Sequence, residues 1–74
     1  MQIKDLPENT SVSDIRVRIP ETFEHECRLS GLNSYEVYIV SMWHMGVWVK
    51  INRDDERMYP ITNVMNLEDW KVIK

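Results

Sequence analysis

The sequence predicts a small, mostly β domain in which five or six short antiparallel strands close, fully or partly, into a barrel. Three observations predict it: a β-rich hairpin candidate over residues 36–51, several short segments of alternating apolar and polar residues, and a length of only 74 residues. Alternation with period two is typical of a strand with one buried face. A barrel is favoured because closure removes the exposed edges of a short sheet. An open antiparallel sheet with one covering turn is the alternative.

The first strand is predicted over residues 14–20. Residues 1–13 are expected to form an irregular lead-in because they contain Pro7, Asn9, Thr10, Ser11 and Ser13. In the strand itself, Ile15, Val17 and Ile19 share one face, and polar residues occupy the other. A proline ends the segment because it has no N–H to donate to a neighbouring strand.

A weaker alternation over residues 22–29 predicts a second strand, with a long irregular loop as the alternative. The residues that would share its apolar face are Phe23, His25, Cys27 and Leu29. Residues 30–34 contain Gly, Asn and two Ser, and their composition is typical of a turn.

The central hairpin reverses direction at His44-Met45-Gly46, and two registers remain open. A two-residue turn at Met45-Gly46 places Trp43 opposite Trp48, whereas a three-residue turn places Trp43 opposite Val47. Because a shift of one residue exchanges the buried and exposed sets, the face that Trp43 occupies stays undecided.

The second arm of the hairpin is clearer. Val47, Val49 and Ile51 form its apolar face, which leaves Trp48 and Lys50 pointing the other way. We therefore expect the Trp48 side chain to be exposed.

The C-terminal third supplies the remaining elements. Residues 52–57 are predicted to form a charged connection, and residues 58–61 a short strand. We expect this strand at a sheet edge because it contains a proline. Asn66 is expected to cap one helical turn, with Trp70 directed inward. Residues 71–74 form the last strand.

Two resemblances rest on short motifs. The series Gly46-Val-Trp-Val-Lys-Ile51, Met58-Tyr-Pro-Ile61 and Leu67-Glu-Asp-Trp-Lys-Val-Ile73 resembles an SH3-like barrel, in which a short helical turn also precedes the last strand. The opening Lys4-Asp-Leu-Pro-Glu-Asn-Thr10, with Gly-Val-Trp and Tyr-Pro, is similar to small bacteriophage and prophage proteins of unassigned activity. The chain lacks the Ala-Leu-Tyr-Asp-Tyr segment and the paired tryptophans of signalling SH3 domains. The resemblance therefore implies a fold and gives no ground for predicting that the chain binds proline-rich peptides.

Composition predicts one domain over residues 1–74 and a cytoplasmic protein. Apolar residues make up 43% of the chain and charged residues 28%, as in ordinary globular domains. The single cysteine, Cys27, excludes an intramolecular disulfide. We see no signal peptide and no apolar run of about 20 residues, so no membrane is expected as a partner.

Metal, cofactor and catalytic sites are not predicted. His25 and Cys27 would offer two ligands, whereas zinc takes three or four from the protein, and the only other histidine is His44. A Cys27 nucleophile would need a hydrogen-bonded base and a third group to orient it. Asp54-Asp55-Glu56 lacks the ligand spacing of a calcium loop and is interpreted as a solvated turn. We predict that the protein is not an enzyme.

The predicted partner-binding site is the tip of the central hairpin. Tryptophan and methionine are enriched at the centres of protein interfaces. The alternative is that a small barrel uses these tryptophans to complete its core. The candidate site residues are Trp43, His44, Met45, Trp48 and Lys50.

These observations predict a non-enzymatic protein-binding module, in the role of a phage or prophage accessory protein. Its partner would be a host or phage protein, or a second copy of itself. The alternative is a small barrel that binds single-stranded nucleic acid with Arg16, Arg18, Lys50 and Arg53 beside an exposed Trp48. A net charge of −3 disfavours that alternative.

Overall fold

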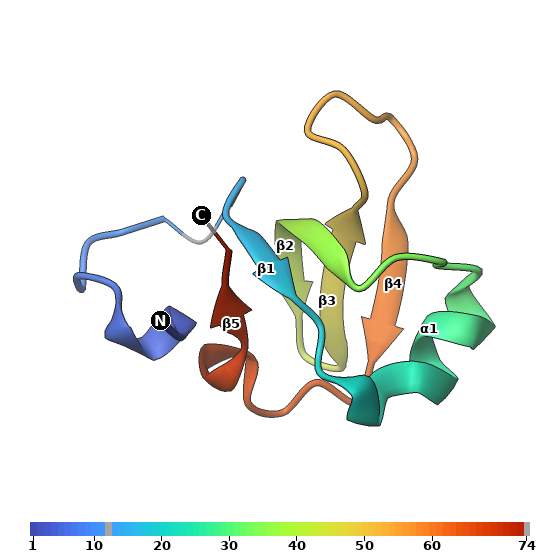
Figure 1. Ribbon diagram of the computed structural model, residues 1–74, viewed down its shortest axis with the longest axis horizontal. Helices are drawn as coiled ribbons and strands as arrows, with labels where there is room; N and C mark the ends of the chain where they lie inside the picture. The colour runs from blue at the N-terminus through green and yellow to red at the C-terminus, as the bar shows by residue number, and fades with distance from the viewer. Residues whose placement is uncertain (12, 74) are drawn as a thin grey trace.

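The computed structural model describes residues 1–11 and 13–73 and shows one antiparallel sheet covered on one side by helical segments (Figure 1). The mostly β fold is confirmed, and apart from residues 22–29 the predicted strands are present with shorter or slightly shifted bounds. Lys74, the last residue of the predicted final strand, lies outside the described residues. The elements are η1 (Ile3–Asp5), β1 (Arg16–Arg18), η2 (Glu21–Phe23), α1 (Glu24–Ser30), β2 (Glu36–Trp43), β3 (Gly46–Lys50), β4 (Tyr59–Thr62), η3 (Leu67–Asp69) and β5 (Lys71–Val72).

The strand order is β4-β3-β2-β1-β5, and every neighbouring pair is antiparallel. In the described part of the chain β4 and β5 pair with no strand beyond them, so the sheet is open. Closure into a barrel is therefore a wrong prediction, and the open sheet kept as the alternative is correct. The prediction of an edge position for the proline-containing strand β4 is confirmed.

Other segments cover the two edges instead. The N-terminal residues lie along β5: the Val72 N–H donates to the Met1 carbonyl at 2.7 Å, and the Ile3 N–H donates to the Trp70 carbonyl at 3.0 Å. At the opposite end of the sheet α1 contacts β4. The expected irregular lead-in thus contains an ordered helical turn, η1, whose Ile3 side chain is buried. Because other segments cover both edge strands, the sheet does not need to close into a barrel to protect these edges from pairing with other chains.

The segment predicted as a second strand is helical, so both the strand and its alternative, the irregular loop, are wrong. η2 and α1 are continuous, and Glu24 and Arg28 form an i,i+4 ion pair at 2.6 Å. Gly31, with φ of 81°, ends the helix in the left-handed conformation that glycine adopts without strain. The four residues expected to share one strand face are divided: Cys27 is buried, Phe23 packs against the core, and His25 and Leu29 are exposed.

The core lies between the inner face of the sheet and the helical segments. Trp70 is its largest fully buried side chain and meets the Phe23 ring at a centroid distance of 5.5 Å. The predicted helical turn before the last strand is confirmed as η3; Asn66 precedes it without a side-chain capping bond. The buried residues are Ile3, Val17, Ile19, Cys27, Leu32, Val37, Ile39, Val47, Val49, Ile61, Leu67 and Trp70.

Gly46 allows β3 and β4 to approach each other at the hairpin end of the sheet. It is paired with Thr62, and a Cβ atom built on it would collide with the Ile61 carbonyl oxygen. The constraint is space, because the φ of Gly46 is not in the positive range. The glycine expected in the turn is therefore the first residue of β3 and is needed for strand pairing.

We expect Gly46→Ala to lower the free energy of unfolding by at least about 2 kcal/mol, because the β4 backbone must shift to admit the methyl group. Urea denaturation measures the loss. Thr62→Ala, which alters the paired residue without adding atoms, is the matched control and should cost less. Equal unfolding midpoints for Gly46→Ala and the wild type would contradict the close approach.

Candidate functional site

The β2–β3 hairpin has a register that differs from both predicted ones. Its turn is His44-Met45, and Trp43 pairs with Gly46. Pairing runs from Ile39–Val49 directly to Ser41–Trp48, so Val40 is an extra, unpaired residue in β2. Such a β-bulge reverses which face the following residues occupy.

The bulge decides the position of Trp43. Before it, Val37 and Ile39 are buried on the inner face of the sheet. Strict alternation would continue with Ser41 and Trp43 on that same face. The extra residue instead places both on the outer face, which is the face of Trp48.

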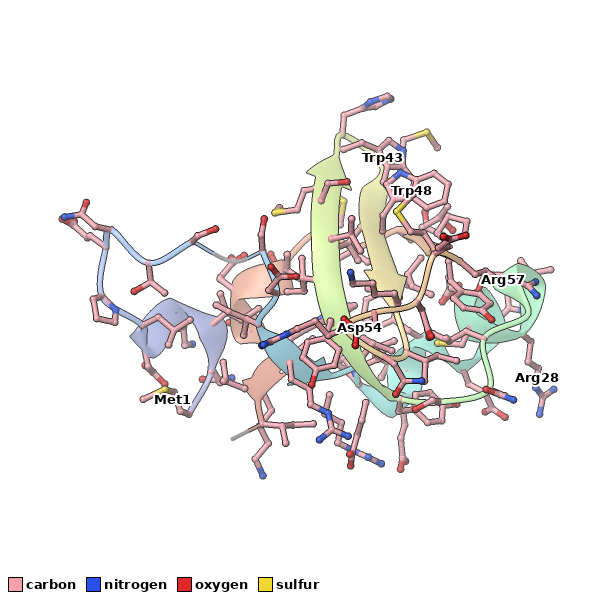
Figure 2. The ribbon with its side chains drawn as sticks, turned by 90° about the horizontal axis from the view of Figure 1, so that it is seen from above. Met1, Arg28, Trp43, Trp48, Asp54 and Arg57 are labelled. Carbon is pink, nitrogen blue, oxygen red and sulfur yellow. The ribbon has the colours of Figure 1, made fainter. Side chains whose placement is uncertain are left out.

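Trp43 and Trp48 lie against each other on the outer face (Figure 2). Their ring centroids are 5.3 Å apart with an interplanar angle of 37°, and both side chains are half-buried. Gly46, which pairs with Trp43, has no side chain on this face. The predicted outward direction of Trp48 is confirmed, and the core role considered for Trp43 is wrong.

We call this part of the outer face the aromatic surface; it consists of Trp43, Trp48 and the exposed turn residues His44 and Met45. Met45 is 54% exposed. Every outer-face position of the sheet at this end is uncharged: Ser41, Trp43, Gly46, Trp48, Pro60 and Thr62. An uncharged surface with two adjacent indoles can bury an apolar group of a partner.

The other end of the outer face is charged. Tyr38 on β2 pairs with Arg16 on β1 and with Lys50 on β3, so cations flank it on both sides. The Arg53 guanidinium lies 5.4 Å from the centroid of the Tyr38 ring. We call this end of the outer face the cationic surface. It comprises Tyr38, the cations Arg16, Arg18, Lys50 and Arg53, and Lys71, which pairs with Arg18 from the edge strand β5.

Four of the five predicted site residues therefore form one surface. Lys50 shares the outer face but is directed, by its pairing with Tyr38, into the cationic surface. Sequence reasoning missed Tyr38 and Lys71. A signal for Tyr38 was present, because it alternates with the buried Val37 and Ile39.

His25 and Cys27 do not form a pair. Cys27 faces the core from α1, whereas His25 is exposed. Burial, with a smaller contribution from the Glu26 carboxylate, raises the pKa of the Cys27 thiol above its ordinary value of 9.0. Both effects disfavour the thiolate, which is the reactive form.

The acidic run 54–56 lies in the connection between β3 and β4. The Asn52 N–H donates to the Asp55 carboxylate at 3.0 Å, a local turn contact. Among residues 1–11 and 13–73, no three His, Cys, Asp or Glu side chains gather closely enough to hold a metal ion. No helix within these ranges is long and apolar enough to cross a bilayer.

A shallow cleft of about 350 Å³ opens beside the hairpin turn. The Asn63 N–H, at its margin, donates to the Met45 carbonyl at 2.8 Å. The cleft was not predicted, because its lining comes from segments far apart in the sequence. Its lining residues are Pro20, Thr22, Phe23, Asn63, Met65, Asn66, Asp69 and Trp70.

Comparison with known proteins adds no relative: no protein-family model, curated protein or solved structure gives a significant match to this chain.

The contact between the two indoles should be measurable as a coupling in stability. In a double-mutant cycle of Trp43→Ala and Trp48→Ala, we expect an interaction free energy of about 0.5–1.5 kcal/mol, typical of an aromatic pair. Urea denaturation of the four proteins gives the value. Losses that simply add, within about 0.3 kcal/mol, would show that the rings are not in contact.

Burial of the Cys27 thiol should make stability depend on alkaline pH. Because burial raises the folded-state pKa of Cys27, the contribution of the buried thiol to the free energy of unfolding is fully present below about pH 9. This contribution is lost as the pH rises through the folded-state pKa. The difference in unfolding free energy between the wild type and Cys27→Ala should therefore be constant at neutral pH and shrink at alkaline pH. A difference that grows with rising pH would contradict the burial.

Proposed function

We propose that this chain is a non-enzymatic module that binds a partner protein through the aromatic surface. The observation that carries the proposal is the Trp43–Trp48 pair on the solvent side of the sheet. Helical segments cover the inner face, whereas the outer face carries two adjacent, half-buried indoles.

The side chains of this surface suit a protein interface. Tryptophan is among the residues that contribute most to interface energy, because a large ring buries much apolar area with few rotatable bonds. Met45, exposed on the turn, can adapt its flexible thioether to the shape of a partner. The pair itself is partly ordered before binding, since each indole already packs on the other.

The chemistry of the surface specifies the contacting part of the partner. Since the outer-face positions at this end are uncharged, we propose that the partner inserts an apolar or aromatic side chain and that charge plays little part. A host or phage protein is the proposed source of that side chain, in keeping with a phage or prophage accessory role. A second copy of this chain is the competing outcome.

The relation to SH3-like folds is also part of the proposal. It is supported by η3, the helical turn directly before the last strand. The helix between β1 and β2 and the open sheet are differences from a closed barrel.

We expect Trp48→Ala to weaken partner binding by at least about thirtyfold, which corresponds to about 2 kcal/mol for a central interface residue. Quantitative affinity capture of phage-infected and uninfected host lysates measures the effect. The matched control is Leu29→Ala, which removes a 72% exposed apolar side chain from α1, outside the aromatic surface.

A partner that Trp48→Ala loses and Leu29→Ala retains would support the proposal. If Trp48→Ala retained every captured protein, the aromatic surface would not be the binding site. If sedimentation showed that the wild type forms a dimer that Trp48→Ala dissociates, the occupant would be a second copy.

A further inference from the structure

We propose that the cationic surface binds single-stranded nucleic acid, with Tyr38 at its centre. This site lies at the opposite end of the outer face from the aromatic surface and does not rest on the proposed protein partner. Sheet order creates it. β1 and β3 both pair with β2, so Arg16 and Lys50 flank Tyr38 although they lie far apart in the sequence.

The balance of charge favours an anionic ligand. The paired outer-face positions of the surface carry four cations, Arg16, Arg18, Lys50 and Lys71, and one carboxylate, Glu36. The connection after β3 adds Arg53, which lies over Tyr38, together with the acidic residues 54–56. The Glu36 carboxylate lies 3.1 Å from Arg16 and 3.5 Å from Arg18. Lys50, Arg53 and Lys71 form no ion pair with any described residue, and their charge is therefore available to a ligand.

The net charge of −3 does not oppose this local attraction. At physiological ionic strength, interactions between exposed charges are largely screened beyond about 8 Å. The molecule measures 32 × 26 × 22 Å, several times that range, so the net charge of the whole chain does not set the potential at one face. The carboxylates nearest to Arg53 in the sequence are those of residues 54–56, which follow it in the same connection. The net charge of the whole chain disfavoured nucleic-acid binding, but it does not describe the local charge of this one face.

Aromatic and guanidinium groups favour nucleic acid over an acidic peptide. Arg53 lies over Tyr38, and Arg18 lies 5.9 Å from the centroid of the Tyr35 ring. Planar groups of this kind stack on bases while neighbouring cations contact phosphates. An acidic peptide would pair with the cations of the surface but has no bases to stack on the planar groups. A duplex keeps its bases stacked inside, so this surface suits a single strand.

Fluorescence anisotropy with labelled oligothymidine and oligouridine of about 12 nucleotides tests the site. We expect binding at low salt, with affinity falling on a log–log plot with a slope of about −2 if about three phosphates are neutralised. The double variant Arg16→Glu/Lys50→Glu should weaken binding at least tenfold. The control Lys4→Glu/Arg28→Glu makes the same change of net charge outside the cationic surface and should have a much smaller effect.

Tyr38→Leu tests stacking separately from charge, because it keeps apolar bulk and removes the ring. We expect it to weaken binding at least about fivefold. Lys50→Gln and Lys71→Gln, which replace cations that form no ion pair, serve if the double variant does not fold, and each should reduce affinity and make the salt slope shallower.

Several outcomes would overturn the inference. These are no binding at low salt, equal weakening by both double variants, or polyglutamate competing as well as the oligonucleotide at equal charge. The last result would assign the surface to an acidic protein. Because Trp48→Ala lies outside the cationic surface, its effect on protein capture is scored independently of these results.

Discussion

The outer face of the sheet depends on one unpaired residue, Val40 in β2. Without it, the alternation of β2 would direct Trp43 into the core side of the sheet. With it, Trp43 lies beside Trp48 on the solvent side, and its partner in β3 is Gly46. Gly46 also allows β4 to approach β3, so the edge strand pairs closely at the same end of the sheet that carries the aromatic surface.

The arrangement of layers then determines which face can bind. The helix, the η3 turn and the buried Trp70 all lie on the inner side of the sheet, together with the apolar residues of the central strands. The outer side carries no covering element among the described residues (Figure 1). An antiparallel sheet with one solvated face is common, and its exposed face normally carries polar residues. Here that face is divided into an uncharged aromatic end and a charged end centred on Tyr38.

Part of the fold was predictable because its signals are local. Alternation identified β1 and β3, a proline identified β4 as an edge strand, and the helical turn before Trp70 was predicted from Asn66, which precedes the turn. The helix was missed although local signals for it were present: acidic residues at its start, the Glu24–Arg28 spacing, and Gly31 at its end. Over eight residues, the apolar pattern fits a strand and a helix nearly equally well, because Phe23 and Cys27 lie four apart and also share a strand face.

The sequence by itself determined the strands outside residues 22–29 and the outward direction of Trp48, because both follow from periodicity within one segment. It also predicted the inward direction of Trp70 from the helical turn that precedes this residue. Only the tertiary structure decided the hairpin register, the face of Trp43 and the gathering of Arg16, Tyr38 and Lys50. These depend on how strands meet. Whether a bulge forms depends on the contacts that β2 makes with both neighbouring strands. The periodicity of residues within β2 carries no information on those contacts.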